Sequence, residues 1–268
     1  NSPAQRANIL VGDIVIKMDG EDYTEKLTQD VVSYIRGKDA ANVVITVLRD
    51  NEEIEIDVEI ETVMLPSVDS EIIEKDGAKI GYISISIFAA NTFQQFATHL
   101  DDLEKQVDGL IIDVRDNTGG YLSTVEQMLG LFFNKDKIIY KTEEKGEITS
   151  IYSKGSINKK YPIVVLVNQA SASASEIMIA AFQETYQAPI VGMTTYGKGT
   201  VQELIDFNGE EAFKYTARKW LTPDGNWIND TGIIPDYEIE QSEEYYLEFT
   251  KDKDAQLQKA IEVFLEIE

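Results

Sequence analysis

One serine and one lysine are the residues of this sequence whose types and spacing can do chemistry together. Ser173 lies in the serine-rich segment Gln169–Glu176, and Lys198 follows between two glycines. A serine hydroxyl needs a base before it can act as a nucleophile, and an uncharged lysine amine can be that base. The pair predicts a hydrolase that works through a Ser–Lys dyad.

The composition argues against the other common pairs of nucleophile and base, which use cysteine or histidine. The chain has no cysteine and a single histidine, His99, so a cysteine nucleophile is excluded. His99 lies beside the apolar stripe of its helix, where we expect a packed or boundary residue rather than a base. One histidine and no cysteine also argue against a histidine-rich or zinc–thiolate site, so we expect no metal site of these kinds.

Ser173 is placed where an apolar strand passes into a helix. The strand is expected over Pro162–Val167, and the helix from about Ser173 to Tyr186. A serine in the first helical turn lies near backbone N–H groups that have no helical partner, at the positive end of the helix dipole. These groups, that of Ala174 first, can hold the oxyanion that forms when a carbonyl is attacked. A cluster of capping serines is the alternative interpretation of this segment.

Lys198 becomes a base only where burial or a neighbouring charge lowers its pKa from the ordinary value of about 10.4. The apolar pair Ile190–Val191 precedes it, and the flanking glycines let other backbone approach closely. If residues 198–202 form a strand, Lys198 and Gln202 share one face, and the amide oxygen of Gln202 can hold the lysine amine. A solvated lysine in a turn is the alternative.

A pair of glycines follows a second buried strand. Gly109–Val114 is an apolar run, as expected of a strand covered on both faces. The loop after it contains Gly119 and Gly120, whose N–H groups can turn toward a ligand at the carboxyl end of the strand. We expect this loop to complete the oxyanion hole with Ala174. A tight turn without a chemical role is the alternative.

The segment Gly192–Lys198 matches the phosphate-binding pattern G-x-x-x-x-G-K, which suggests a rival function. That motif needs a serine or threonine next, and a helix that starts at once. Here Gly199 follows, and Thr200–Phe207 has the pattern of a strand. We therefore do not expect nucleotide binding.

The pattern of the chain divides it into three parts. Residues 1–62 have the pattern of a small β-rich unit with one helix, for which Thr28 is the expected cap. Residues 63–250 alternate between strands and helices, and residues 251–268 contain an amphipathic helix. That last helix can dock on its own domain or join two copies of the chain.

The chain is strongly acidic. Forty-eight acidic and 24 basic residues give a formal charge of −24, a field that repels nucleic acid and anionic membrane surfaces. No stretch approaches the roughly 20 apolar residues that cross a bilayer, and no signal peptide opens the sequence. The first residues look like the interior of a domain, so we expect a segment upstream of Asn1.

Together these motifs resemble the carboxyl-terminal processing peptidases, also called tail-specific proteases, which are Ser–Lys endopeptidases with a PDZ domain. The resemblance extends along nearly the whole chain. It is carried by blocks in the family's order: Ser2–Ala4, Gly12–Ile14 and Asp19–Gly20 for the PDZ domain, Ile80–Ile85 and Leu110–Gly120 for the entry to the protease core, Ser171–Glu176 and Tyr196–Gln202 for the active site, and Trp220–Gly225 and Gly232–Asp236 for the closing motifs.

The resemblance implies a fold and a set of site residues. The fold is α/β, with a crotonase-like (ClpP/crotonase) protease core and an N-terminally incomplete PDZ domain over residues 1–62. The implied site residues are the nucleophile Ser173, the base Lys198, its orienting residue Gln202 and, for the oxyanion hole, Gly119 or Gly120 with Ala174.

The resemblance further implies no cofactor, an extracytoplasmic location, and protein substrates cut near exposed apolar C-termini. The chain departs from the family at Thr118, where proline is usual, and at Met193–Thr194, where a more polar pair is usual. Neither departure removes a catalytic group. The PDZ resemblance begins late, so we expect the strand and loop that capture a peptide carboxylate to precede this sequence.

Two functions from different classes follow. The first is a serine endopeptidase, and the second is a non-catalytic peptide-binding or scaffold protein of the same fold. The presence of both Ser173 and Lys198 favours the enzyme, since a scaffold has no need of the pair.

Overall fold

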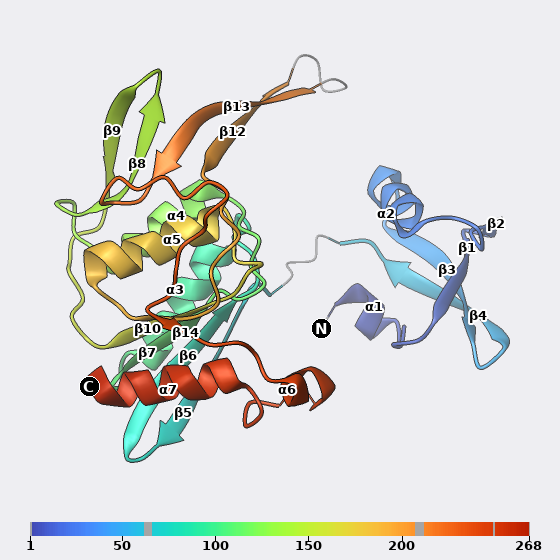
Figure 1. Ribbon diagram of the computed structural model, residues 1–268. Helices are drawn as coiled ribbons and strands as arrows, with labels where there is room; N and C mark the ends of the chain where they lie inside the picture. Colours follow the sequence, from blue (N-terminus) through green and yellow to red (C-terminus); the bar gives the residue numbers. More distant parts are fainter. Residues whose placement is uncertain (1, 62–65, 207–211, 249, 268) are drawn as a thin grey trace. The chain divides into compact units, whose positions relative to one another are not determined.

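Two units follow one another along the chain, Asn1–Leu65 and Pro66–Glu268, and each has a hydrophobic core of its own (Figure 1). The computed structural model describes residues 2–61, 66–206, 212–248 and 250–267.

The first unit is built on an antiparallel sheet with the strand order β2-β1-β3-β4. Strand β4 confirms the alternation in the sequence, because Ile56 and Val58 are buried and the acidic residues beside them are exposed. Leu27, not Thr28, precedes helix α2, and the carboxylate of Asp30 accepts the Leu27 N–H at 2.8 Å. The elements are α1 (Pro3–Arg6), β1 (Ile14–Met18), β2 (Glu21–Asp22), α2 (Thr28–Gly37), β3 (Asn42–Arg49) and β4 (Glu52–Glu59).

Two aspartates hold the first unit together. Asp13 forms an ion pair with Arg49 at 2.7 Å, and Asp19 pairs with Lys38 and accepts the Val44 N–H at 3.0 Å. Hydrogen bonds to these cationic side chains lower the pKa of Asp13 and that of Asp19 from 3.8 to about 2.

The second unit contains a six-stranded sheet in the order β14-β11-β10-β7-β6-β5. Its strands pair in parallel, except that β5 is antiparallel to β6. Both β7 and β10 are buried along their whole length, which confirms the interpretation of their apolar runs. The strands are β5 (Val68–Lys75), β6 (Ala78–Ile85), β7 (Gly109–Asp113), β10 (Ile163–Val167), β11 (Ile190–Gly192) and β14 (Tyr237–Glu238).

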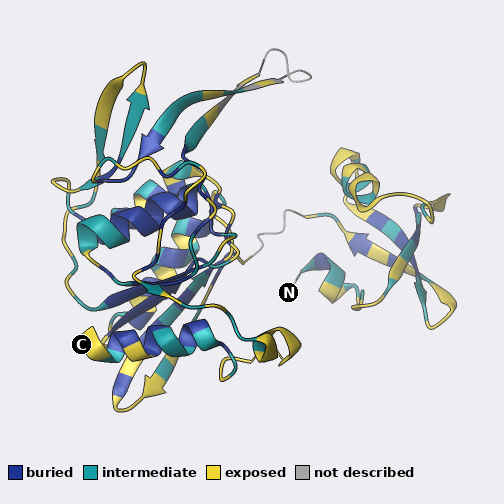
Figure 2. Ribbon diagram, viewed as in Figure 1, coloured by how far each residue is buried: buried dark blue, intermediate teal, exposed yellow. Residues whose placement is uncertain are grey.

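Helices cover both faces of this sheet (Figure 1), and its central strands have the buried colour in Figure 2. On one face, Leu110 and Val165 pack in a cluster with α3, α4 and α5. On the other face, Ile111 and Val164 pack against α7. The mixed α/β core that was predicted is thereby confirmed. The helices are α3 (Thr92–Leu103), α4 (Leu122–Leu129), α5 (Ala174–Ala180), its π-helical continuation η1 (Ala181–Tyr186), α6 (Glu243–Glu248) and α7 (Ala255–Ile267).

A smaller antiparallel sheet with the order β12-β13-β8-β9 extends from the second unit (Figure 1). The sequence interpretation had not identified β8, β9 or β5. Strand β12 begins only two residues after Lys198, with no helix between, which removes the phosphate-binding interpretation of that segment. The strands are β8 (Ile138–Glu144), β9 (Glu147–Tyr152), β12 (Thr200–Asp206) and β13 (Ala212–Leu221).

The C-terminal helix α7 docks on its own domain. Its apolar face, with Leu257, Ala260 and Phe264, is buried against the six-stranded sheet. A dimer formed through this helix would therefore have to use its outer, polar face. None of the helices within the described ranges is long and apolar enough to cross a membrane.

Candidate active site

Ser173 lies at the sharp turn between β10 and α5. Its φ of 60° and ψ of −115° place a non-glycine residue in a rarely populated region of the backbone map. Strain of this kind persists only where the surrounding structure imposes it, and it occurs at the nucleophile turns of hydrolases. Among the side chains that the structure describes, none is hydrogen-bonded to Ser173 Oγ. The hydroxyl is therefore uncommitted.

The two neighbouring serines have structural roles. Ser171 Oγ donates to the carbonyl of Val114 at 2.8 Å, and Ser175 Oγ donates to the carbonyl of Asn117 at 2.7 Å. Both serines are completely buried. The cluster thus divides into two serines that fasten the turn to the loop after β7, and one, Ser173, whose hydroxyl is left for another purpose.

A buried carboxylate, that of Glu176, joins the serine turn to the lysine loop. It accepts the N–H of Ser173 at 2.8 Å, that of Lys198 at 2.9 Å and that of Gly197 at 2.7 Å. The hydroxyl of Thr195 also donates to it, at 2.6 Å. The spacing S-x-x-E of a capping box indicated the contact to Ser173 N–H. The contacts to residues 195–198 have no local sequence pattern, and sequence reasoning missed them.

Lys198 is half-buried just before β12. Its carbonyl accepts the Trp220 Nε1–H at 2.6 Å. The expected close approach of backbone to its glycines is confirmed: a Cβ on Gly197 would lie 2.8 Å from the nitrogen of Gly232, and one on Gly199 would lie 2.7 Å from other nitrogens. The backbone of Lys198 is thus held rigidly, and its side chain makes no hydrogen bond to Ser173 Oγ.

Gln202 is exposed on β12, opposite Thr216 of β13. Because the strand starts at Thr200, the alternation that was expected to align Gln202 with Lys198 does not extend back to the lysine. The register of the pair also shifts between Val201 and Gln202. Within the described part of the chain, Gln202 and Lys198 share no hydrogen bond, and the orienting role of Gln202 stays a prediction.

The glycine loop lies directly against the nucleophile. A Cβ on Gly119 would be 3.0 Å from Ser173 Cβ and 3.1 Å from Ala174 N. The Gly119 N–H is already taken, because it donates to Asn117 Oδ1 at 2.9 Å. The N–H groups of Gly120 and Ala174, in contrast, have no partner among the described residues. Of the two glycines considered, Gly120 is therefore the one that can contribute an oxyanion donor.

Asn117 positions this loop, and sequence reasoning did not single it out. Its side chain is fully buried and donates to the carbonyl of Ile85 at 2.9 Å while accepting from Gly119. Its own carbonyl accepts from Ala172 N–H at 3.0 Å and from Ser175 Oγ. One buried asparagine thus links the end of β6, the glycine loop and the serine turn.

His99, the one histidine of the sequence, lies on α3. His99 is half-buried on α3, where its Nδ1 lies 2.6 Å from Ser70 Oγ, and it is not part of the serine turn. In the ranges that the structure describes, no group of three or more His, Cys, Asp or Glu is arranged to hold a metal ion.

Two models of known protein families match the chain. Residues 79–239 match the model of peptidase family S41, and residues 1–60 match that of the PDZ domain. The chain belongs to peptidase family S41. The residues matched by the S41 model include the glycine loop, the serine turn and the lysine loop.

Among the S41 relatives, the carboxy-terminal processing protease CtpB of Bacillus subtilis is 38% identical over 244 residues, which cover 90% of this chain and 51% of CtpB. A probable CtpA-like serine protease of Staphylococcus aureus is 35% identical over 247 residues, covering 89% of this chain and 48% of that protein. The chain therefore spans about half the length of these relatives.

Solved structures have a similar fold. The photosystem II D1 C-terminal processing protease has a TM-score of 0.59 at 25% identity, over 89% of this chain and 66% of that one. Mature CPAF complexed with lactacystin has a TM-score of 0.60 at 14% identity, over 97% of this chain and 79% of that one. At this identity the likeness concerns the fold only. The predicted crotonase-like core is consistent with the S41 fold.

Proposed function

We propose that the chain is a serine endopeptidase that cleaves proteins near exposed apolar C-termini, with Ser173 as nucleophile, Lys198 as base and Gln202 in support. The observation that carries the proposal is the buried Glu176 carboxylate, which accepts backbone N–H groups from both Ser173 and Lys198. Glu176 thereby fixes the backbone of Ser173, at the strained turn, together with that of Lys198, which is distant in the sequence. The names of the relatives as carboxy-terminal processing and serine proteases agree with this function.

The first half of the proposed reaction forms an acyl-enzyme. Ser173 Oγ attacks the substrate carbonyl carbon while Lys198 Nζ takes the hydroxyl proton. The carbonyl oxygen becomes negative and accepts the uncommitted N–H groups of Gly120 and Ala174. Collapse of this intermediate breaks the peptide bond, and Lys198 returns the proton to the leaving amine.

The second half regenerates the enzyme. A water molecule gives a proton to Lys198 Nζ and attacks the ester carbonyl, and the same two N–H groups hold the second oxyanion. Ser173 Oγ then leaves with the proton from Lys198, and the new carboxyl terminus is released. No other group of the chain has to change its protonation state.

The proposal includes a rotation of the Lys198 side chain. Its backbone is fixed by Glu176 and Trp220, while Nζ is not engaged with Ser173 Oγ. Catalytic hydrogen bonds are often absent before substrate binds and form in the complex. In the proposal, substrate binding brings Nζ to the hydroxyl, where the Gln202 amide can orient it.

The test is cleavage of an unstructured protein with an apolar C-terminal tail. We expect the parent to cut it, and Ser173→Ala and Lys198→Ala to lose turnover without losing the fold. Activity at the parental level in either variant would exclude the dyad. Peptide binding without cleavage by the parent would instead favour the scaffold alternative.

Three wider parts of the proposal go beyond the site, and the first two of them rest on the family resemblance. The PDZ domain is proposed to bind peptide tails, and the protein is proposed to work outside the cytoplasm. A homodimer through the polar face of α7 is also proposed, and sedimentation will distinguish it from a 30.1 kDa monomer. Cell fractionation tests the location, and binding of a tail peptide tests the PDZ domain.

A further inference from the structure

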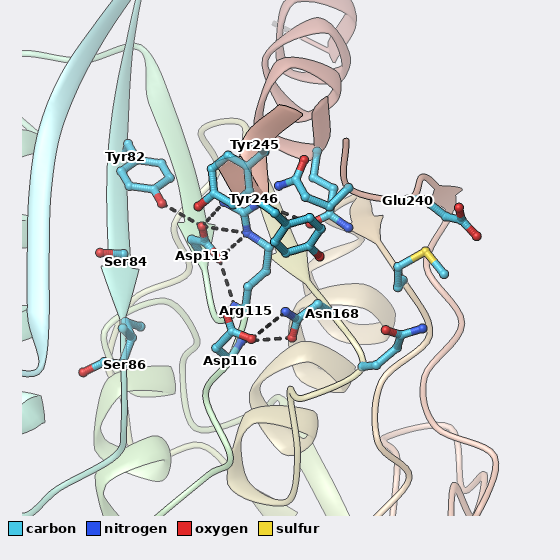
Figure 3. A pocket seen from close by; sticks show the side chains of 15 residues that line it. Tyr82, Ser84, Ser86, Asp113, Arg115, Asp116, Asn168, Glu240, Tyr245 and Tyr246 are labelled. Carbon is cyan, nitrogen blue, oxygen red and sulfur yellow. Dashed lines mark hydrogen bonds and ion pairs between the residues drawn. The ribbon is translucent and has the colours of Figure 1, made fainter. Parts of the chain in front are cut away.

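The three loops of the candidate active site are fastened in two different ways. The glycine loop and the serine turn are tied to each other, because Asp116 N–H donates to Asn168 Oδ1 and Asn168 Nδ2 donates back to Asp116 Oδ1, both at 2.9 Å (Figure 3). The lysine loop, Gly197–Gly199, is held by Glu176 and by a short segment, Trp227–Asp230, that lies about 30 residues further along the chain.

This segment makes three contacts with the lysine loop. Trp227 Nε1–H donates to the Gly199 carbonyl at 2.9 Å, and Asn229 Oδ1 accepts the Gly199 N–H at 3.2 Å. The Asp230 N–H donates to the Gly197 carbonyl at 2.9 Å. Two of the three contacts come from side chains, so each can be removed by substitution without a change in the backbone.

The three contacts complete the polar partners around Lys198. Its own N–H donates to Glu176, and its carbonyl accepts the Trp220 Nε1–H. Every N–H and every carbonyl of residues 197–199 is thereby hydrogen-bonded. Because peptide groups are planar, fixing the two groups that flank Lys198 fixes its φ and ψ, and with them the direction of its Cα–Cβ bond.

The segment is itself anchored on two sides. Ile228 is buried in the hydrophobic core of the domain. Lys219 Nζ lies 4.5 Å from the centroid of the Trp227 ring and pairs with Glu143 at 3.3 Å. The Trp227 side chain is 46% exposed, so burial accounts for only part of its contribution. Its hydrogen bond to the lysine loop is the contact that ties this exposed ring to the candidate site.

We infer that Trp227 and Asn229 are positioning residues for the proposed base, Lys198. They fix the backbone from which the lysine amine reaches Ser173 Oγ. The lysine side chain is long and flexible, so the position of Nζ is limited only if the backbone that carries it stays in place. A displacement of about 1 Å can lower a rate about 100-fold. The inference rests on the proposed function, since both residues act through Lys198.

The kinetics of variants at the two positions test this role. Trp227→Phe removes the indole N–H, and Asn229→Leu removes the acceptor of the Gly199 N–H with little change in size. We expect each to lower kcat about 5- to 50-fold and to leave KM within about 2-fold, because no substrate contact is changed. Asn229→Asp keeps the acceptor oxygen and should keep kcat within about 3-fold of the parent. Equal losses of kcat in Asn229→Asp and Asn229→Leu, or a rise in KM alone, would overturn the inference.

Asn226→Leu is the matched control, one residue before the segment. Asn226 is exposed, and its amide donates to Glu184 Oε1 at 3.4 Å, away from the lysine loop. We expect this variant to keep the parental kcat. A loss of kcat as large as that of Asn229→Leu would mean a general disturbance of this part of the domain and would contradict a specific role of Asn229.

Hydrogen exchange tests the contacts without cleavage. The N–H groups of residues 197–199 should exchange at least about 5-fold faster in Trp227→Phe and Asn229→Leu than in the parent, because the backbone that the two side chains hold is released. Faster exchange with the parental kcat would overturn the positioning role. Unchanged exchange in both variants would show that the two side chains do not hold the loop.

Cleavage by the parent separates this inference from the proposed function. A parent that cleaves, with both variants cleaving at the parental kcat, would support the endopeptidase and overturn the inference. A parent that cleaves no substrate would overturn the endopeptidase and the positioning role together.

Discussion

Replacing Glu176 by glutamine tests how the candidate active site is held together. The carboxylate is completely buried and is surrounded by four donors, three of them backbone N–H groups and the fourth the Thr195 hydroxyl. Glutamine has the same shape but only one acceptor oxygen, and its NH₂ group must donate. In either orientation of the amide, one side of the original carboxylate loses its acceptor.

The less damaging orientation points the NH₂ toward Thr195, because a hydroxyl can reverse and accept. Gly197 N–H is then left without an acceptor, which costs about 1–3 kcal/mol for a buried donor. The contacts from Ser173 and Lys198 become neutral, and each weakens by about 1 kcal/mol. We expect the free energy of unfolding of the second unit to fall by about 3–5 kcal/mol, and its Tm by about 6–20 °C.

Urea unfolding followed by tryptophan fluorescence measures this loss. The chain has two tryptophans, Trp220 and Trp227, and both report on the second unit. Glu184→Gln is the matched control on η1, because Glu184 binds the Asp224 N–H at the surface, where we expect less than about 1 kcal/mol. We also expect kcat of Glu176→Gln to fall about 10- to 100-fold, since the serine turn and the lysine loop lose their common support. A Glu176→Gln protein as stable and as active as the parent would refute this reasoning.

Three further predictions follow from single contacts. Gly120→Ala would place a Cβ 2.3 Å from the carbonyl oxygen of Phe88, at a φ of 140°. We expect kcat to fall about 100- to 1,000-fold, because the N–H of residue 120 is displaced from the oxyanion hole. Gly146→Ala is the control, since Gly146 also has a positive φ but open space around it; equal kcat values of the two variants would contradict the role of Gly120 as an oxyanion donor. Asn117→Ala leaves the Gly119 N–H and the Ile85 carbonyl without their side-chain partner, and we expect the free energy of unfolding in urea to fall by about 2–4 kcal/mol. An unchanged midpoint of unfolding would contradict this expectation. Because the pKa values of Asp13 and Asp19 are lowered to about 2, their stabilisation of the first unit is present above about pH 4 and is lost as the pH falls toward 2. Hydrogen exchange of residues 2–61 across this range checks the last prediction, and pH-independent protection there would contradict it.

Short-range patterns in the sequence predicted the features that depend on neighbouring residues. The two apolar runs form the buried strands β7 and β10, and the segment of alternating acidic and aliphatic residues forms the half-exposed strand β4. Ser173 lies at the sharp turn before α5, where the sequence predicted a change from strand to helix. Each of these outcomes is decided by the spacing of apolar residues or by backbone preference within about ten positions.

The contacts that assemble the candidate site were not predictable in this way. The Glu176 carboxylate reaches a loop about 20 residues further along the chain, and Asn117 contacts the carbonyl of Ile85 on another strand. The strand over residues 198–202 on which the alignment of Gln202 with Lys198 depended begins only at Thr200, and its register shifts after Val201. The orienting role of Gln202 therefore stays a prediction. Such contacts depend on how elements pack, and packing has no signature in local periodicity.

The residue types of the dyad and its glycines were determined by the sequence alone, because chemistry follows from the side chain itself. Which glycine offers its N–H, and whether α7 docks on its own sheet, were decided only by the tertiary structure. A donor is available only if no other acceptor has taken it, and an apolar face is free only if nothing covers it. Whether a donor is free and whether an apolar face is covered both depend on residues that are distant in sequence and come together only in the folded protein.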